Sequence, residues 1–155
     1  MKFTLVKNLK ADPLMRPILL GLLIFTTLFL LSDFIIMIDF FGSSWQAIND
    51  TFYGNEEEFI DPLSWGALLE IVHKNIFFMM MTLMILVTIF IRLHKQNETT
   101  KFLVHLIMIT ALLSIITFVT AFYIPHYVLL FWLVSTLLWH ILALYMSLSS
   151  TFKLV

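Results

Sequence analysis

Four long apolar stretches constrain this chain more than any other feature. A helix needs roughly 20 apolar residues to cross the ~30 Å hydrocarbon core of a bilayer, and residues 17–41, 65–92, 102–123 and 127–147 each meet that requirement. Only 12% of the residues are charged, against about a quarter in a typical soluble domain. We therefore predict an all-α fold, a four-helix transmembrane bundle that forms a single membrane domain over residues 1–155.

Local signals mark the ends of these stretches. Asp12 and Asp61 each precede a proline, an arrangement that favours a capping carboxylate before the first helical turn. Pro125 predicts a short turn between the third and fourth stretches. The first apolar run is too long for the core of a signal peptide, and no small-residue cleavage site follows it, so we expect a retained helix.

Charged residues divide unequally between the two sides of the predicted bundle. Eight of the nine Lys and Arg residues flank the spans on one side. They are Lys2, Lys7, Lys10, Arg16, Arg92, Lys95, Lys101 and Lys153. The opposite side holds a loop, residues 42–64, with five acidic residues. The positive-inside rule therefore predicts cytoplasmic N and C termini in a multi-pass membrane protein.

Ionisable side chains inside the predicted spans need a partner or a function, because each costs at least ~2.5–3.5 kcal/mol in hydrocarbon. Asp33 and Asp39 lie in the first span, and Glu70 and Lys74 share one face of the second. A buried salt bridge of Lys74 with Glu70 or Asp33 would hold two helices together. The same groups could instead form a proton path or a metal site, and Lys74 could neutralise a haem propionate. The sequence leaves these alternatives open.

Histidines in the last three spans suggest haem ligation. His126 and His140 are fourteen residues apart, which puts them on nearly the same helical face, about 21 Å apart along the axis. Two haems stacked across the bilayer would need this arrangement. His73 matches His126 in depth, which makes an outer pair. For His140 the candidate partner is His105, with His94 in the basic loop a weaker choice. Each histidine could equally be a hydrogen-bonded packing residue.

Other chemistry is restricted. The chain has no cysteine, which removes disulfides, thiolate metal sites and covalently attached haem. No phosphate-binding loop, nucleophile elbow or metalloprotease helix is present. No basic cluster occurs away from the membrane-flanking segments, so we expect membrane lipid and not nucleic acid as a partner. The acidic run Glu56–Glu58 is typical of a solvated loop, and it could steer a basic periplasmic redox protein such as a cytochrome c.

Two of the spans resemble those of a known family. Residues 126–140, HYVLLFWLVSTLLWH, resemble the last helix of the di-haem cytochrome b (gamma) subunits of respiratory formate dehydrogenases and nickel-iron hydrogenases. Residues 69–78, LEIVHKNIFF, with a basic end at Arg92, resemble the second helix of that family. The predicted topology also matches. The family has a further histidine near the cytoplasmic start of its first helix, and the first span of this chain has none there.

The resemblance implies a small membrane b-type cytochrome, the electron-transfer subunit of a respiratory oxidoreductase complex. It would carry one or two b-haems and pass electrons between a periplasmic redox partner and a quinone near the cytoplasmic face. His73 and His126 would bind the outer haem iron. His140 would bind the inner one, with His105 in place of the missing histidine. Two alternatives remain: a haem-free accessory or scaffold subunit of a larger membrane complex, and a small proton-coupled transporter.

Overall fold

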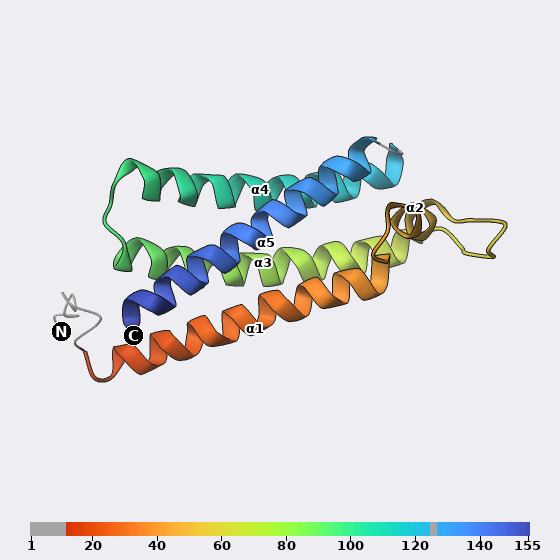
Figure 1. Ribbon diagram of the computed structural model, residues 1–155. Coiled ribbons are helices and arrows are strands. Elements are labelled where there is room, and N and C mark those ends of the chain that lie inside the picture. Colours follow the sequence, from red (N-terminus) through yellow and green to blue (C-terminus); the bar gives the residue numbers. More distant parts are fainter. Residues whose placement is uncertain (1–11, 125–126) are drawn as a thin grey trace.

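The computed structural model describes residues 12–124 and 127–155, and these form five α-helices (Figure 1). Four of the helices are long and apolar enough to cross a membrane. They are α1 (Met15–Phe41), α3 (Trp65–Leu93), α4 (Glu98–Tyr123) and α5 (Tyr127–Leu154). The predicted all-α fold and its four membrane spans are thereby confirmed.

Polar caps extend the helices beyond the apolar stretches. The Asp12 carboxylate accepts hydrogen bonds from the Leu14 and Met15 amides, as its position before Pro13 predicts. The span predicted to begin at residue 102 begins at Glu98, because the Asn97 side chain accepts a hydrogen bond from the Thr100 amide. At the other end of the chain, α5 continues beyond residue 147 to Leu154.

The predicted cap at Asp61 is wrong. The N-cap of α3 is Ser64, whose hydroxyl accepts a hydrogen bond from the Ala67 amide. Pro62 precedes the helix, and the next residue, Leu63, donates its amide to the Thr51 carbonyl. The segment around Pro62 is therefore held against the preceding loop and is not available as a first helical turn.

A short helix that the sequence analysis did not predict occupies the acidic loop. It is α2 (Trp45–Tyr53), which begins at the Ser44 cap and ends at Gly54, a residue with a φ of +80°. Its Ile48 and Phe52 side chains are buried. Figure 1 shows α2 at the end of the bundle that is opposite the start of α1 and the end of α5, with residues 54–64 projecting beyond it.

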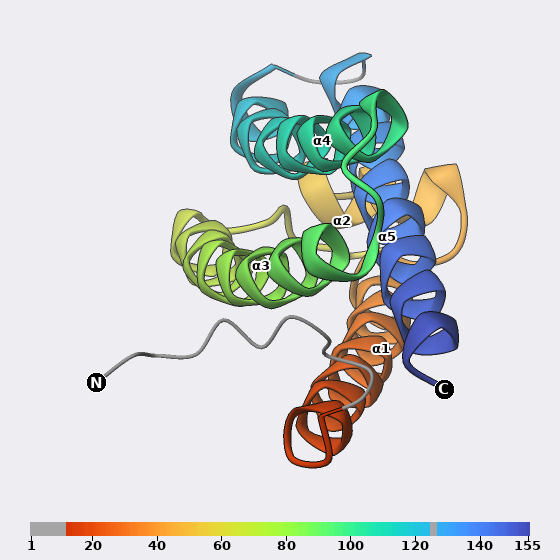
Figure 2. The same cartoon turned by 90° about the vertical axis from the view of Figure 1, so that its left-hand side faces the viewer.

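The fourth span, α5, is the centre of the bundle. It packs against α1, α3 and α4, whereas α1 and α3 contact each other only sparsely. In the end view α4 and α1 lie on opposite sides, with α3 and α5 between them (Figure 2). Three hydroxyl pairs join the helices: Thr27 with Ser147 at 2.8 Å, Ser114 with Thr136 at 2.7 Å, and Thr117 with Ser135 at 3.3 Å.

Charge separates along the bundle as predicted, within the described residues. The start of α1 and the end of α5 meet, since the Arg16 guanidinium donates to the carbonyls of Leu154 and Val155 at 2.8 and 3.1 Å. The basic ends of α3 and α4, with Arg92 and Lys101, lie at the same end (Figure 1). The acidic loop lies at the other. Which end faces the cytoplasm stays a prediction.

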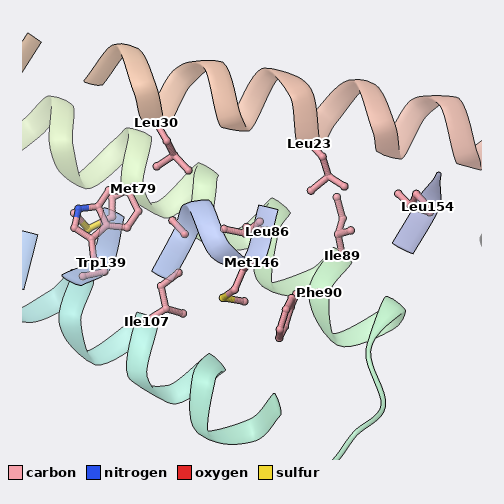
Figure 3. Packing of buried hydrophobic residues seen from close by; sticks show 12 residues of the cluster. Leu23, Leu30, Met79, Leu86, Ile89, Phe90, Ile107, Trp139, Met146 and Leu154 are labelled. Carbon is pink, nitrogen blue, oxygen red and sulfur yellow. The ribbon is translucent and has the colours of Figure 1, made fainter. Parts of the chain in front are cut away.

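Two apolar clusters form the core. The terminal cluster, whose packing Figure 3 shows, lies towards the end of the bundle where α5 ends and includes Leu23, Leu30, Met79, Leu86, Phe90, Ile107, Trp139 and Met146. The α2 cluster lies under α2 and includes Phe41, Ile48, Phe52, Leu68, Phe118 and Trp132. The candidate site lies between these two clusters.

Candidate ligand-binding site

A carboxylate and an imidazole meet where α1 passes α5. Asp33 Oδ2 lies 2.9 Å from His140 Nε2, and the other ring nitrogen, Nδ1, lies 2.8 Å from the Thr136 carbonyl oxygen. The His140 side chain is 5% exposed and that of Asp33 is 35% exposed. The pair is therefore largely removed from the surroundings of the bundle, although Asp33 keeps an open side.

The hydrogen bonds of His140 restrict where protons can lie. A carbonyl only accepts, so Nδ1 must carry a proton for its contact with Thr136. The contact between Nε2 and Asp33 then holds one further proton, as imidazolium with carboxylate or as imidazole with carboxylic acid. Both forms have no net charge, which suits a site inside a membrane. The pair can thus release or accept one proton at a fixed place.

Neighbouring side chains hold the imidazole in position. The Thr136 hydroxyl forms a hydrogen bond with the Ser114 hydroxyl of α4. This bond fixes the turn of α5 that carries the Thr136 carbonyl, the acceptor for His140 Nδ1. Two aromatic rings flank the imidazole, Trp139 with a centroid distance of 4.6 Å and Phe34 at 6.2 Å. The His140 ring is therefore held by contacts within α5 and with α1, and α4 supports it indirectly through Thr136.

A cavity of about 420 Å³ adjoins the pair. Aromatic side chains from all four spans make up much of its wall. They include Phe29 and Phe40 of α1, Phe78 of α3, Phe118 of α4, and Trp132 and Trp139 of α5. Such a site, apolar with a few convergent polar groups, is typical of small-molecule binding.

The cavity opens sideways, between α1 and α3. Its lining residues on α4 and α5 are buried, whereas Ser32 and Ile36 on α1 and Asn75 and Phe78 on α3 are exposed. Along the bundle axis the terminal cluster lies on one side and the α2 cluster on the other. A ligand would therefore enter from the lipid and not along the axis from water.

Polar groups from both helices line this mouth. The Ser32 hydroxyl and the Asn75 amide have no hydrogen-bond partner within the described part of the chain. Lys74 also lines the cavity, and its Nζ lies 3.0 Å from Glu70 Oε1. This ion pair joins residues of one helix at the surface. The prediction of a buried salt bridge that holds two helices together is therefore wrong.

The predicted haem ligands do not converge within the described residues. His73 of α3 and His105 of α4 are exposed, and neither lines the cavity. His126 lies outside the described residues. His140 uses both ring nitrogens in the contacts above, and residues 12–124 and 127–155 contain no group of three or more His, Asp or Glu that could hold a metal ion. Haem binding stays a prediction.

The remaining predicted groups are separate from the site. Asp39 is exposed near the α2 end of α1 and does not line the cavity. His94 caps α3, where its Nε2 lies 2.9 Å from the Ser149 hydroxyl and its Nδ1 lies 3.0 Å from the Phe90 carbonyl. Burial lowers the pKa of His94, as does the charge of Lys153, while the Phe90 carbonyl raises it.

The pairing of Asp33 with His140 is the main feature that the sequence analysis missed. The sequence marks both residues as polar groups within spans, but its patterns suggest Lys74 as a partner for Asp33 and His105 for His140. The two residues are 107 positions apart. The spacing of residues along a helix predicts which face of that helix is polar, but it does not predict which helix lies next to that face. The similar depth of Asp33 and His140 in the bundle is the signal that could have suggested their contact.

Fold and comparisons agree on the class of protein. The four apolar helices define a multi-pass membrane protein, whose lipid contacts follow from its exposed apolar surface. Residues 42–155 match a family described as a transmembrane helical domain, Aq_1264_TM, and the chain belongs to this family. The match begins after α1, so it includes Lys74 and His140 but not Asp33. No curated protein and no solved structure matches the chain.

Proposed function

We propose that this chain is a membrane subunit of a respiratory oxidoreductase in a bacterial inner membrane, and that it binds a quinone in the cavity between α1 and α3. The observation that carries the proposal is the hydrogen-bonded Asp33–His140 pair on the wall of an aromatic cavity that opens sideways between α1 and α3. The resemblance to di-haem cytochrome b subunits supplies the quinone and the respiratory setting.

The residues of the cavity fit a quinone. Its flat, apolar ring suits a wall of aromatic side chains, and its isoprenoid tail could leave through the mouth into the bilayer. The Asn75 amide and the Ser32 hydroxyl offer donors for carbonyl oxygens. The site lies towards the α2 end, whereas the resemblance implies a quinone near the predicted cytoplasmic face. We therefore place the quinone from the geometry of the cavity alone.

Reduction of a quinone to a quinol adds electrons and protons in equal number. The chain contributes the proton step, because the Asp33–His140 pair holds one transferable proton within an otherwise apolar wall. Thr136 keeps the Nδ1 proton in place, so the proton that moves is the one at Nε2 and Asp33. The pair becomes anionic when it releases that proton, and the open side of Asp33 allows a replacement to arrive.

Electrons would come from a redox partner, as the resemblance implies. A b-haem on His73 and His126 remains our proposal for the carrier within the membrane, with a second haem on His140 and His105. The contacts of His140 with Asp33 and Thr136 weigh against the second haem, because they already occupy both ring nitrogens. A b-haem would give purified protein a reduced-minus-oxidised α-band that His73→Ala and His126→Ala remove together.

The sideways opening also bears on the alternative functions. A transporter of water-soluble solutes needs access along the bundle axis, but apolar clusters occupy both directions. A purely structural subunit needs no cavity with a titratable pair. The geometry thus favours a lipid-soluble ligand.

Binding of menadione, a naphthoquinone without a tail, tests the proposal. Trp132 and Trp139 line the cavity, so a bound quinone should quench their fluorescence. The assay would use purified protein in lipid nanodiscs, with Trp45 and Trp65 replaced by Phe to isolate the signal. We expect saturable quenching in this background.

Asp33→Asn is the diagnostic variant. The asparagine amide would donate to Nε2 and remove the transferable proton, which should weaken menadione binding about three- to tenfold, the effect of losing one hydrogen bond. Asp39→Asn, an exposed acid on the same helix, is the control and should bind as before. Unsaturable quenching, or equal affinities in both variants, would contradict the proposal.

A further inference from the structure

Lys74 lies at the mouth of the cavity, but its ammonium group pairs with Glu70, which lies outside the cavity. Its side chain lines the cavity, whereas Glu70, one helical turn towards the α2 end, does not. The two side chains are 54% and 71% exposed. Lysine has a long, flexible stem, so its ammonium group can reach different partners by side-chain rotation alone.

The charges of the cavity make Lys74 distinct. Among the described residues that line it, Lys74 is the one lysine or arginine. Asp33 of α1 and His140 of α5 compensate each other, and α4 contributes Ser114 and Phe118, which have no charge. Rotation of Lys74 away from Glu70 would therefore give the cavity a net positive charge at its mouth.

We propose that Lys74 is the ligand-binding cation of this cavity and that Glu70 competes with the ligand for it. The inference rests on the proposed quinone site and names its ligand class, a quinone that bears an ionised hydroxyl group. An anionic oxygen forms a charge-assisted hydrogen bond with the ammonium group, stronger than any that a neutral carbonyl forms. Glu70 holds Lys74 outside while the site is empty or contains a neutral ligand.

A simpler account of these residues is a surface ion pair of helical spacing. Such a pair contributes little on its own, and it would leave ligand affinity unchanged when either member is replaced. The two accounts differ for Glu70, because a surface pair predicts no change in ligand affinity when Glu70 is replaced, whereas a competitor predicts a gain.

The test compares two probes by tryptophan quenching in nanodiscs at neutral pH. Menadione is neutral, and lawsone, its hydroxylated relative, is an anion. Lys74→Met should weaken lawsone binding about tenfold. Glu70→Gln should strengthen it about two- to threefold, the effect of one exposed ion pair. Menadione affinity should stay within about twofold in both variants.

The chain provides a matched control in α4. Lys101 and Glu98 form another exposed ion pair within one helix, at 2.8 Å, away from the cavity. Lys101→Met and Glu98→Gln should change neither affinity. Thermal unfolding of each variant would confirm that the fold is retained, and Glu70→Gln tests for a gain that misfolding cannot produce.

Each other outcome overturns a specific part of the argument. If menadione binds saturably but lawsone affinity is the same in the Lys74 and Glu70 variants as in the unmodified chain, the role of Lys74 is refuted and the quinone site is retained. Equal changes for both probes would show that Lys74 shapes the cavity without recognising charge. Binding of neither probe would remove the quinone site and this inference together.

Discussion

His94 and His140 both have two occupied ring nitrogens, but the groups that face them differ. His140 faces the Asp33 carboxylate, which can balance a positive imidazolium. His94 faces a hydroxyl and a carbonyl, with the positive charge of Lys153 nearby. A positive charge on His94 would therefore have no carboxylate beside it, whereas a positive charge on His140 would lie beside Asp33. Only the second arrangement suits a site that exchanges protons.

The lowered pKa of His94 predicts a pH-dependent stability. Burial is the main cause, so the folded state prefers the neutral ring and its pKa lies below the usual value of 6.5. The stabilising contribution is then complete above about pH 6.5 and is lost as the pH falls through the folded-state pKa. Thermal unfolding in detergent, measured from about pH 7.5 to about pH 5, should show this loss.

His94→Gln is the variant that assigns the effect. It retains groups that can bond Ser149, but it cannot titrate, so part of the acid destabilisation should disappear. The exposed His105 provides the control, and His105→Gln should unfold with the pH dependence of the unmodified chain. Identical pH profiles for His94→Gln and the unmodified chain would assign the acid sensitivity elsewhere.

At the scale of elements, α2 covers one end of the bundle with its side chains. Phe52 stacks on Phe41 at 5.4 Å and also contacts Phe118 and Trp132. The Tyr53 hydroxyl donates to the Ala121 carbonyl of α4 at 2.9 Å. These contacts place α2 against α1, α4 and α5, and so keep the cavity apart from the surface at this end.

Truncation of Phe52 should therefore destabilise the whole bundle. The side chain is buried with 3% exposure, and Phe52→Ala should lower the free energy of unfolding by about 3–5 kcal/mol, as for other buried phenylalanines. Phe59, in the same loop but 94% exposed, is the control, and Phe59→Ala should change it by less than about 0.5 kcal/mol. Equal effects would show that α2 is not packed on the bundle.

The sequence predicted elements well and their contacts poorly. The spans followed from apolar length and charge, properties that each stretch carries by itself. The nine-residue α2 gave no such signal, although Ser44 and Gly54 mark its ends and its apolar residues Ile48 and Phe52 are four apart. Of the site, Asp33, Lys74 and His140 were each identified. Their arrangement in space depends on which helices lie next to each other, and the periodicity of the sequence carries no information about that.

At the scale of the whole molecule, orientation decides which compartment meets the acidic loop. Apart from Lys74, the described basic residues lie at the end of the bundle opposite the loop (Figure 1). The positive-inside rule then puts the loop outside, with the cavity in the outer half of the membrane. With this orientation, the redox partner and the proton supply of our proposal would both meet the bundle from the outer side.

The absence of native cysteine makes this orientation directly testable. Glu57→Cys would report on the acidic loop, and Lys95→Cys on the turn between α3 and α4, both at exposed positions. In intact spheroplasts a membrane-impermeant maleimide should label the first variant and reach the second only after permeabilisation. The unmodified chain, which has no thiol, gives the background. The reverse pattern would place the acidic loop in the cytoplasm, and the periplasmic partner would then have no surface to meet at this end of the bundle.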